Sequence, residues 1–282
     1  MRRKSRMTRS VASILVVVFC NVALFLNATL PSAATTIRAA HFSTPSAIAV
    51  SGTHVWVANS GNGGGNGSVT ELNASNGSLI RVINAPADRF NGPDAIAVSG
   101  ADVWVANNGG GYGNGSVTEL NASNGSLVRS ITARRYGFST PDAIAVSGAD
   151  VWVANNGGFG NGSVTELNVS NGSLVRVIDA AADGFTATNG IVVSGPHVWV
   201  LNNGGSTDQT SVTELNASNG SLVRVIDASV DEFTAPSAIV VNGPHVWVAN
   251  SAGANGGPNG KSRNASVTQL NASNGSLVRV IR

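Results

Sequence analysis

The sequence repeats one unit five times, and this repetition restricts the fold more than any other feature. The unit spans residues 68–83 and reads Ser-Val-Thr-Glu-Leu-Asn-Ala-Ser-Asn-Gly-Ser-Leu-Ile-Arg-Val-Ile. Near-copies begin at Ser116, Ser163, Ser211 and Ser266. Two short apolar runs flank Asn-Gly in each copy, and glycine readily adopts the positive φ that a tight turn between antiparallel strands requires. Each copy is therefore predicted to form a β-hairpin.

A second pair of apolar runs precedes each hairpin, so one whole module contains four predicted strands. In the first module these strands span residues 47–51, 54–59, 68–73 and 78–83. The second strand of every module carries a tryptophan, and these are Trp56, Trp104, Trp152, Trp199 and Trp247. Only 11% of the residues are charged and 34 are glycine. This composition favours strands and turns, so the expected class is all-β.

Both faces of the predicted second strand are apolar. In Val55-Trp56-Val57 the tryptophan points to one face and the valines to the other, because side chains alternate along a strand. A four-stranded sheet with two apolar faces must lie between other sheets, and sheets stacked around an axis satisfy this requirement. Stacking on a ligand is the alternative role for the tryptophans, but their recurrence at one register favours core packing.

The length of the module selects the architecture. Successive tryptophans are 48, 48, 47 and 48 residues apart, which is the size of a four-stranded propeller blade. The sequence therefore predicts a β-propeller of five four-stranded antiparallel blades. The expected blades span residues 42–89, 90–137, 138–184, 185–232 and 233–282.

The motif at the end of the second strand resembles a known repeat. Residues 56–59, Trp-Val-Ala-Asn, and their four counterparts are similar to the Tyr-Val-Thr-Asn signature of the YVTN β-propeller repeats, within the broader group of NHL and streptogramin lyase-like propellers. The resemblance covers residues 42–282 and implies the propeller fold. It also implies surface-associated relatives and a lyase that uses a histidine, acidic residues and a divalent metal. No residue here matches that lyase motif.

The N-terminus has the three parts of an export signal. Residues 2–9 are basic, residues 11–26 are apolar, and Ser-Ala-Ala at 32–34 offers a cleavage site. Cleavage after Ala34 would give a secreted or extracytoplasmic protein without stable membrane insertion, whose residues 35–41 form a tail or a stray strand. If the leader is not cleaved, residues 11–26 are expected to act as a membrane anchor.

The charge of the chain limits the kinds of partner it is expected to bind, and its cysteine content limits how it can be stabilised. The formal net charge is +2, but five of the 17 basic residues lie in the first ten positions, and the rest of the chain has 12 basic against 15 acidic side chains. Binding of nucleic acid is not expected, because it requires clustered Lys and Arg. The single cysteine, Cys20, lies in the leader, so the exported chain must be stabilised by its core alone.

The modules differ chiefly at one end of the predicted propeller. This end, which we call the linker end, carries the linkers between modules and the loops between second and third strands. The residue leading into the innermost strand varies there, and the candidate ligand-binding residues are Ser46, Asp94, Asp142, Asn189 and Ser237. Asp94 and Asp142, on neighbouring modules, could bind a divalent cation or share a proton as an acid–base pair. The alternative is that these short polar residues cap the linker turns.

The opposite end, which carries the repeated hairpins, is called the hairpin end. The residues that begin each second strand also vary there, and they are His54, Asp102, Asp150, His197 and His245. A shared metal is not expected, because stacked sheets lie about 10 Å apart whereas Zn–N bonds are about 2 Å. These residues are predicted to be solvated turn residues.

Two further structural predictions concern the hairpin and the ring. A three-residue loop at 75–77 would set Glu71 opposite Arg81, as an exposed ion pair, and Leu72 opposite Ile80. Closure of the five blades in one monomeric chain is predicted through side-chain packing of the first sheet against the last. An open arc that dimerises through those two faces is the competing outcome.

Two classes of function remain open. The first is a non-catalytic scaffold, without a cofactor, that binds a protein, glycan or small ligand at the linker end. The second is a propeller enzyme, a lyase or hydrolase, that uses Asp94 and Asp142 with or without a divalent cation. The first is favoured, because the modules depart from strict repetition at few positions and the changes are chemically mild.

Overall fold

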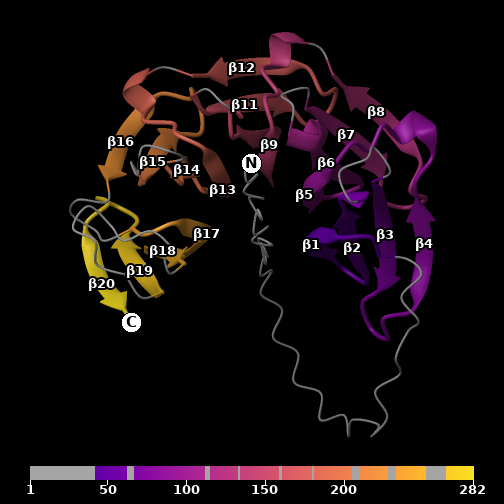
Figure 1. Ribbon diagram of the computed structural model, residues 1–282, viewed down its shortest axis with the longest axis horizontal. Helices are drawn as coiled ribbons and strands as arrows, with labels where there is room; N and C mark the ends of the chain where they lie inside the picture. Colours follow the sequence, from indigo (N-terminus) through magenta and orange to yellow (C-terminus); the bar gives the residue numbers. More distant parts are fainter. Residues whose placement is uncertain are drawn as a thin grey trace, which may run out of the picture.

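Five antiparallel sheets of four strands make up the computed structural model, and in each sheet the strands lie side by side in chain order (Figure 1). The structure describes residues 42–61, 67–111, 115–132, 134–158, 161–179, 181–204, 210–227, 233–251 and 265–282. The predicted leader and the tail at 35–41 lie outside these residues. No helix within the described ranges is long and apolar enough to span a membrane.

Each sheet is one blade, and its four strands run from the inside of the arc to the outside. Blade 1 comprises β1 (Pro45–Ser51), β2 (His54–Asn59), β3 (Ser68–Asn73) and β4 (Leu79–Ile83). Blade 2 comprises β5 (Pro93–Ser99), β6 (Asp102–Asn107), β7 (Ser116–Asn121) and β8 (Leu127–Ile131). Blade 3 comprises β9 (Pro141–Ser147), β10 (Asp150–Asn155), β11 (Ser163–Asn168) and β12 (Leu174–Ile178).

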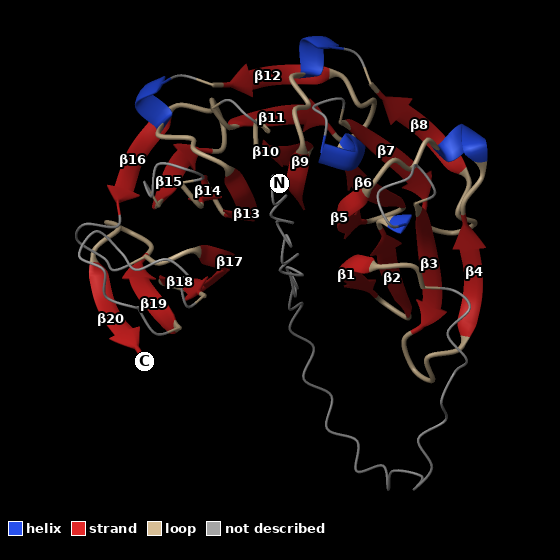
Figure 2. Cartoon of the chain, in the orientation of Figure 1, coloured by secondary structure: helices blue, strands red, loops and turns tan. Residues whose placement is uncertain are grey.

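The last two blades repeat this plan. Blade 4 comprises β13 (Thr188–Ser194), β14 (His197–Asn202), β15 (Ser211–Asn216) and β16 (Leu222–Asp227). Blade 5 comprises β17 (Pro236–Asn242), β18 (His245–Asn250), β19 (Ser266–Asn271) and β20 (Leu277–Ile281). Short 3-10 turns lie in three of the linkers between blades, at Pro86–Asp88, Arg134–Tyr136 and Ala181–Asp183, and a fourth follows β6 at Gly109–Gly111 (Figure 2).

The core lies between the blades. Trp56 of blade 1 packs against Val103 and Val105 of blade 2, with Phe90 from the linker in the same cluster. Equivalent clusters join blades 2 and 3, blades 3 and 4, and blades 4 and 5. The first four tryptophans are at most 1% exposed, which confirms that they are core residues. Trp247, whose face has no following blade, is only half-buried.

The predicted closure of the ring is not found. The innermost strands of successive blades pack against each other from β1 to β17, whereas β17 has no such packing against β1, and the sheets form an open arc (Figure 1). Closure fails for a physical reason. The step between blades is set by the layer of tryptophan, valine and leucine side chains that fills each interface, and five such steps do not bring the last sheet back to the first.

The hairpin differs from the predicted one at two points, and the two differences cancel in the pairing of Glu71 with Arg81. Glu71 lies opposite Arg81 as predicted, but Leu72 lies opposite Leu79, and a bulge separates the two pairs. The loop contains four residues, because Asn73 rather than Ala74 pairs with Ser78 across it. The additional loop residue shifts the strand pairing by one position, and the bulged residue, Ile80, shifts it back. Glu71 therefore still lies opposite Arg81. The same register recurs in the other four blades.

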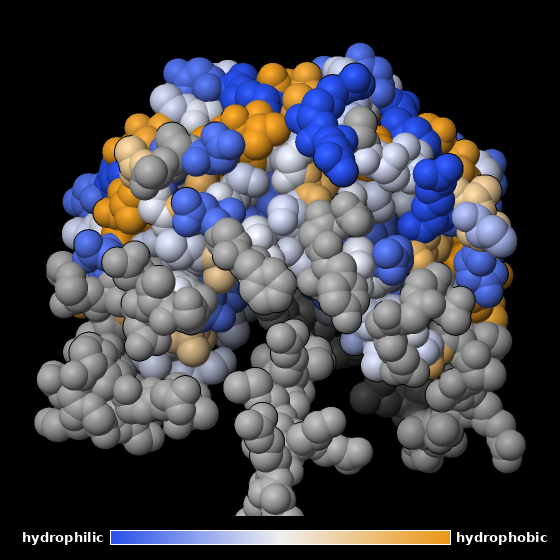
Figure 3. Space-filling view, turned by 45° about the horizontal axis from the view of Figure 1, so that its top comes forward, coloured by the Kyte–Doolittle hydropathy of each residue, from blue (hydrophilic) through white to orange (hydrophobic). Residues whose placement is uncertain are grey.

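The outer strands carry exposed apolar side chains. Members of this set include Leu79, Ile80, Val128, Val175, Val223 and Val278, which are 36–44% exposed. All of these except Leu79 are the bulged residue of their strand, and the bulge turns outward a side chain that would otherwise face a neighbouring blade. Figure 3 shows apolar residues along the outer rim of the arc, interspersed with hydrophilic ones.

Candidate functional site

A β-bulge places each of the five candidate residues at the linker end. In blade 1, Pro45 pairs with Asn59 and Ala47 with Ala58, so that Ser46 is the extra residue on β1. The same irregularity occurs at the start of β5, β9, β13 and β17. Bulges re-aim side chains at the ends of sheets. The side chain at this position can therefore change without changing the pairing of the strand.

Asp94 and Asp142 meet across the boundary between blades 2 and 3. Their carboxyl groups are hydrogen-bonded to each other, and an asparagine holds each of them from its own blade. Asn108 bonds to Asp94, and Nδ2 of Asn156 donates to Oδ2 of Asp142 at 2.9 Å. Two carboxyl groups can bond in this way only when one of them carries a proton.

The surroundings of the pair favour the protonated form of one of its carboxyl groups. Burial, and after it the negative charge of Asp94, raise the pKa of Asp142 to about 8. Burial likewise raises the pKa of Asp94, although its hydrogen bonds to Asp142 and Asn108 oppose this shift. Among the ion pairs of the described residues, none involves either aspartate. At neutral pH the pair therefore holds one proton between two carboxyl groups.

The other three candidates contact the backbone. Oγ of Ser46 donates to the carbonyl oxygen of Pro93 in the next blade at 2.6 Å, and Nδ2 of Asn189 donates to that of Pro236 at 3.0 Å. Oγ of Ser237 donates to Ala249 in its own blade at 3.4 Å. The structure thus joins Asp94 to Asp142 but does not bring all five residues into one cluster. Ser46 and Asn189 bond across blade boundaries rather than capping turns.

The two asparagines were not identified from the sequence. They are the residues directly after the second strand, and this position reads Ser60, Asn108, Asn156, Asn203 and Ser251 along the chain. Serine stands there in the two blades whose inner residue is serine, and asparagine in the three blades whose inner residue is Asp or Asn. This joint variation between modules was the available signal for a contact between the two positions.

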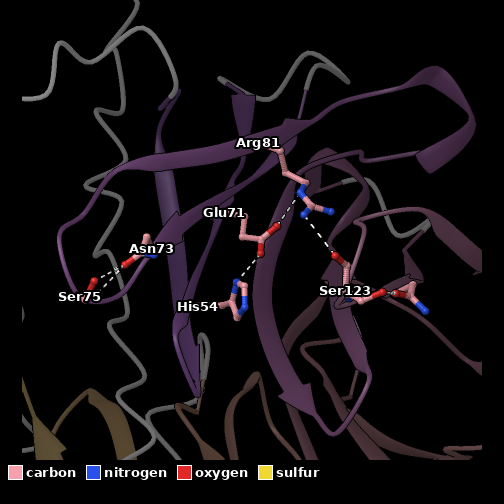
Figure 4. Close-up of polar contacts among 7 residues, drawn as sticks. His54, Glu71, Asn73, Ser75, Arg81 and Ser123 are labelled. Carbon is pink, nitrogen blue, oxygen red and sulfur yellow. Dashed lines mark hydrogen bonds and ion pairs between the residues drawn. The ribbon is translucent and has the colours of Figure 1, made fainter.

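Buried glutamates occupy the hairpin end, and each has an arginine partner. Oε2 of Glu71 lies 2.8 Å from Nε of Arg81, and its Oε1 lies 2.6 Å from Nδ1 of His54 (Figure 4). His197, Glu214 and Arg224 repeat this arrangement in blade 4. The glutamates are fully buried, so the prediction of an exposed ion pair was wrong. The prediction of solvated turn residues was incomplete, because His54 and His197 are partly exposed but bind these glutamates.

Blades 2 and 3 carry aspartate in place of that histidine. Nε of Arg129 lies 2.8 Å from Glu119, and Nε of Arg176 lies 3.0 Å from Glu166. Burial raises the pKa of each glutamate to about 7, its arginine opposes the shift, and the nearby Asp102 or Asp150 adds to it. In blade 5 the glutamate is replaced by Gln269, which accepts from Nε of Arg279 at 2.6 Å.

These groups at the hairpin end connect the blades. Nη2 of Arg81 donates to the carbonyl oxygen of Ser123 in the next hairpin at 3.3 Å (Figure 4). Arg129 and Arg224 make the same bond to Ser170 and Ser273. Within the described part of the chain, no group of three or more His, Cys, Asp or Glu residues is arranged to hold a metal ion. The arginines of the hairpin end thus join neighbouring blades.

Neither a protein-family model nor a curated protein matches the sequence. Solved structures with a similar fold include hydrazine synthase of Kuenenia stuttgartiensis, with a TM-score of 0.66, 20% identity, and coverage of 86% of this chain and 68% of that one. The Pan2 WD40 domain of Neurospora crassa has a TM-score of 0.57, 14% identity, and coverage of 82% and 63%. A chain of a nidogen/laminin complex has a TM-score of 0.56, 11% identity, and coverage of 82% and 76%.

This chain spans about two thirds to three quarters of the length of those structures. At these identities the likeness concerns the fold alone. The five four-stranded antiparallel sheets and this likeness together show that the chain has the β-propeller fold.

Proposed function

We propose that this chain is a secreted or cell-surface β-propeller of the YVTN type that binds a ligand at its linker end without chemical turnover. The observation that carries the proposal is the Asp94–Asp142 pair, a half-buried carboxyl pair with amide partners but no ion pair among the described residues. The presence of one similar propeller in a nidogen/laminin complex supports a binding role. The proposed ligand is a protein, a glycan or a small molecule.

The chemistry of the pair favours binding. Holding two half-buried carboxyl groups side by side costs free energy, because both are partly desolvated and ionising both would bring two negative charges together. A ligand that donates hydrogen bonds from hydroxyl or amide groups, or a divalent cation, would offset that cost. Asn108 and Asn156 add amide groups that can both donate and accept. Such a set suits the hydroxyl groups of a glycan as well as the backbone of a peptide.

The test begins with a screen of the exported protein against glycans, peptides, Ca²⁺ and Mg²⁺. The ligand found is then titrated against a double variant, Asp94→Asn with Asp142→Asn. A matched control changes the two aspartates at the hairpin end of the same blades, Asp102→Asn with Asp150→Asn. We expect the affinity to fall at least about tenfold in the first variant, which is a loss of about 1.4 kcal/mol, and to stay unchanged in the control.

Two outcomes would contradict the proposed site: an unchanged affinity in the Asp94/Asp142 variant, or an equal loss in the control. The proposed export has its own test. N-terminal sequencing of the secreted protein should begin at Thr35, whereas a protein that stays in the membrane with residues 11–26 attached would contradict secretion.

One observation favours a second candidate, a lyase or hydrolase. A carboxyl pair that shares a proton at neutral pH, with the pKa of Asp142 near 8, is typical of a general acid and base. The single variant Asp142→Asn separates the two functions. If the protein is an enzyme, substrate still binds and turnover is lost. If it is a scaffold, binding weakens and no product forms with either protein.

A further inference from the structure

The two faces of a blade are chemically different, and each is complementary to the other. The tryptophan face of blade 1 carries Ala49, Trp56, Val69 and Ile83, and its valine face carries Ile48, Val50, Val55, Val57 and Leu72. The tryptophan face of each blade packs on the valine face of the next in blades 1 to 5. The chain therefore shows this one interface four times.

Polar contacts fix the same interface at both ends of the blades. At the linker end, Ser46 and Asn189 donate to carbonyl oxygens of Pro93 and Pro236 in the following blade. At the hairpin end, Arg81, Arg129 and Arg224 donate to carbonyl oxygens of the following hairpin. The hairpin glycines 125, 172, 220 and 275 pack closely on an isoleucine and an arginine of the preceding blade.

The open arc leaves one half of this interface on each end blade. On the tryptophan face of blade 5, Val240 is 41%, Val267 36% and Ile281 48% exposed. The residues equivalent to Val267 in the other blades are completely buried. On the valine face of blade 1, Val50 is 53% exposed, and Val55 and Leu72 are half-buried although their equivalents in blades 2 to 5 are completely buried.

We propose that copies of this chain associate head to tail, with the tryptophan face of blade 5 in one copy packed on the valine face of blade 1 in the next. The two surfaces are halves of an interface that the chain already forms within itself, so the shape and chemistry of the partner are defined. Arg279, which binds Gln269 in its own blade, would donate to the hairpin of blade 1 of the second copy. Ser237 would reach the carbonyl oxygen of its Pro45.

The geometry of the contact determines the form of the assembly. The two contacting surfaces differ, so each added copy still presents one free face of each kind. Growth is therefore open-ended unless the arcs close on one another. The mass of the assembly rises with protein concentration, in contrast to an isologous dimer, which would stop at two copies.

The test uses two variants that block opposite faces. Ile281→Glu places a charge on the tryptophan face of blade 5, and Val50→Glu places one on the valine face of blade 1. Both side chains are exposed, so the fold should survive, and circular dichroism checks this. Val128→Glu, on the outer strand β8 and 42% exposed, is the control for an added surface charge.

Sedimentation velocity measures the mass of the species that each protein forms. The wild-type protein and Val128→Glu should form species whose mass increases with concentration. Each blocked variant alone should be monomeric. An equimolar mixture of the two should form a dimer with one copy of each, because Val50→Glu retains the tryptophan face and Ile281→Glu retains the valine face. A monomeric wild-type protein, or a mixture that stays monomeric where the wild type associates, would overturn the proposal.

Discussion

The middle blades and the end blades are built from almost the same sequence but differ in what surrounds them. In blades 2 and 3 both faces of the sheet are covered, and Val117 and Val164 are completely buried. The equivalent Val267 of blade 5 is 36% exposed, and its neighbour Ile281 is 48% exposed where Ile131 of blade 2 is 7% exposed. Burial in this protein is thus a property of the interface between modules, as expected for a repeat architecture.

The middle and end blades also differ from each other at the linker end. The bulge that carries the candidate residues is present in all five blades. Its side chain is serine in blades 1 and 5 and aspartate in blades 2 and 3. Serine bonds to backbone carbonyl oxygens, whereas the two aspartates bond to each other. The backbone does not require the carboxyl pair, which points to a role outside the fold.

The largest expected difference between middle and end blades concerns the tryptophans. Trp104→Ala removes a completely buried side chain and should reduce the free energy of unfolding by about 3–5 kcal/mol. Trp247→Ala removes a half-buried side chain and should cost about 1–2 kcal/mol, because part of its surface is already in water. Urea unfolding of the two variants, each combined with Val50→Glu so that the proposed association between copies is blocked, measures both values. Equal losses in this background would contradict the difference in burial between Trp104 and Trp247.

The arginines at the hairpin end provide a smaller difference. Arg129→Ala leaves the buried Glu119 without its cation and should cost about 3 kcal/mol. Arg279→Ala leaves the neutral Gln269, so it should cost about 1 kcal/mol, the typical value of one hydrogen bond. Thermal or urea unfolding at pH 8, where Glu119 is ionised, compares them. A cost for Arg279→Ala as large as that for Arg129→Ala would contradict a charge-based explanation.

The smallest expected difference, and the only stabilising one, concerns Asp142. Its pKa is about 8 in the folded chain and about 3.9 in an unfolded one, so the folded state binds the proton more tightly and stability falls as pH rises between these values. Asp142→Asn supplies a neutral group that needs no proton uptake on folding, so it should stabilise the protein by about 1 kcal/mol at pH 7. It should also reduce the decrease in the free energy of unfolding between pH 4 and pH 8.

A serine of an end blade supplies the control for that variant. Ser46→Asn introduces the residue that blade 4 carries at the same bulge, where Asn189 makes the equivalent bond to the next blade. It should change the stability by less than about 0.5 kcal/mol, with no new pH dependence. If Asp142→Asn and Ser46→Asn behave alike, the middle and end blades do not differ in this respect.

The repeat made the blades predictable from the sequence, but not their closure. The spacing of Trp56 and its equivalents gave the five sheets, and the alternation in Val55-Trp56-Val57 gave the two apolar faces. The step between sheets depends on how side chains of two modules interlock, which no single module encodes. The hairpin loop was mispredicted for a related reason. Asn73 accepts bonds from the backbone and hydroxyl of Ser75, and this turn holds one more residue in the loop.

The candidate site was predictable only in part. The positions of Asp94 and Asp142 on neighbouring modules indicated that they could lie close together, and the structure places them in contact. Their partners Asn108 and Asn156 follow another strand, and only comparison between the modules links them to the pair. The shared proton depends on burial and on the separation of the two carboxyl groups, neither of which a sequence specifies.

The most direct test of the site is a titration of its carboxyl groups. Carbon NMR of labelled aspartate follows each carboxyl between pH 3 and pH 10. We expect Asp142 to titrate near pH 8, and at lower pH in the Asp94→Asn variant, where the neighbouring charge is gone. If Asp142 titrates near pH 4, the ordinary value of an aspartate, and does not respond to Asp94→Asn, the two carboxyl groups do not share a proton and the proposed site is contradicted.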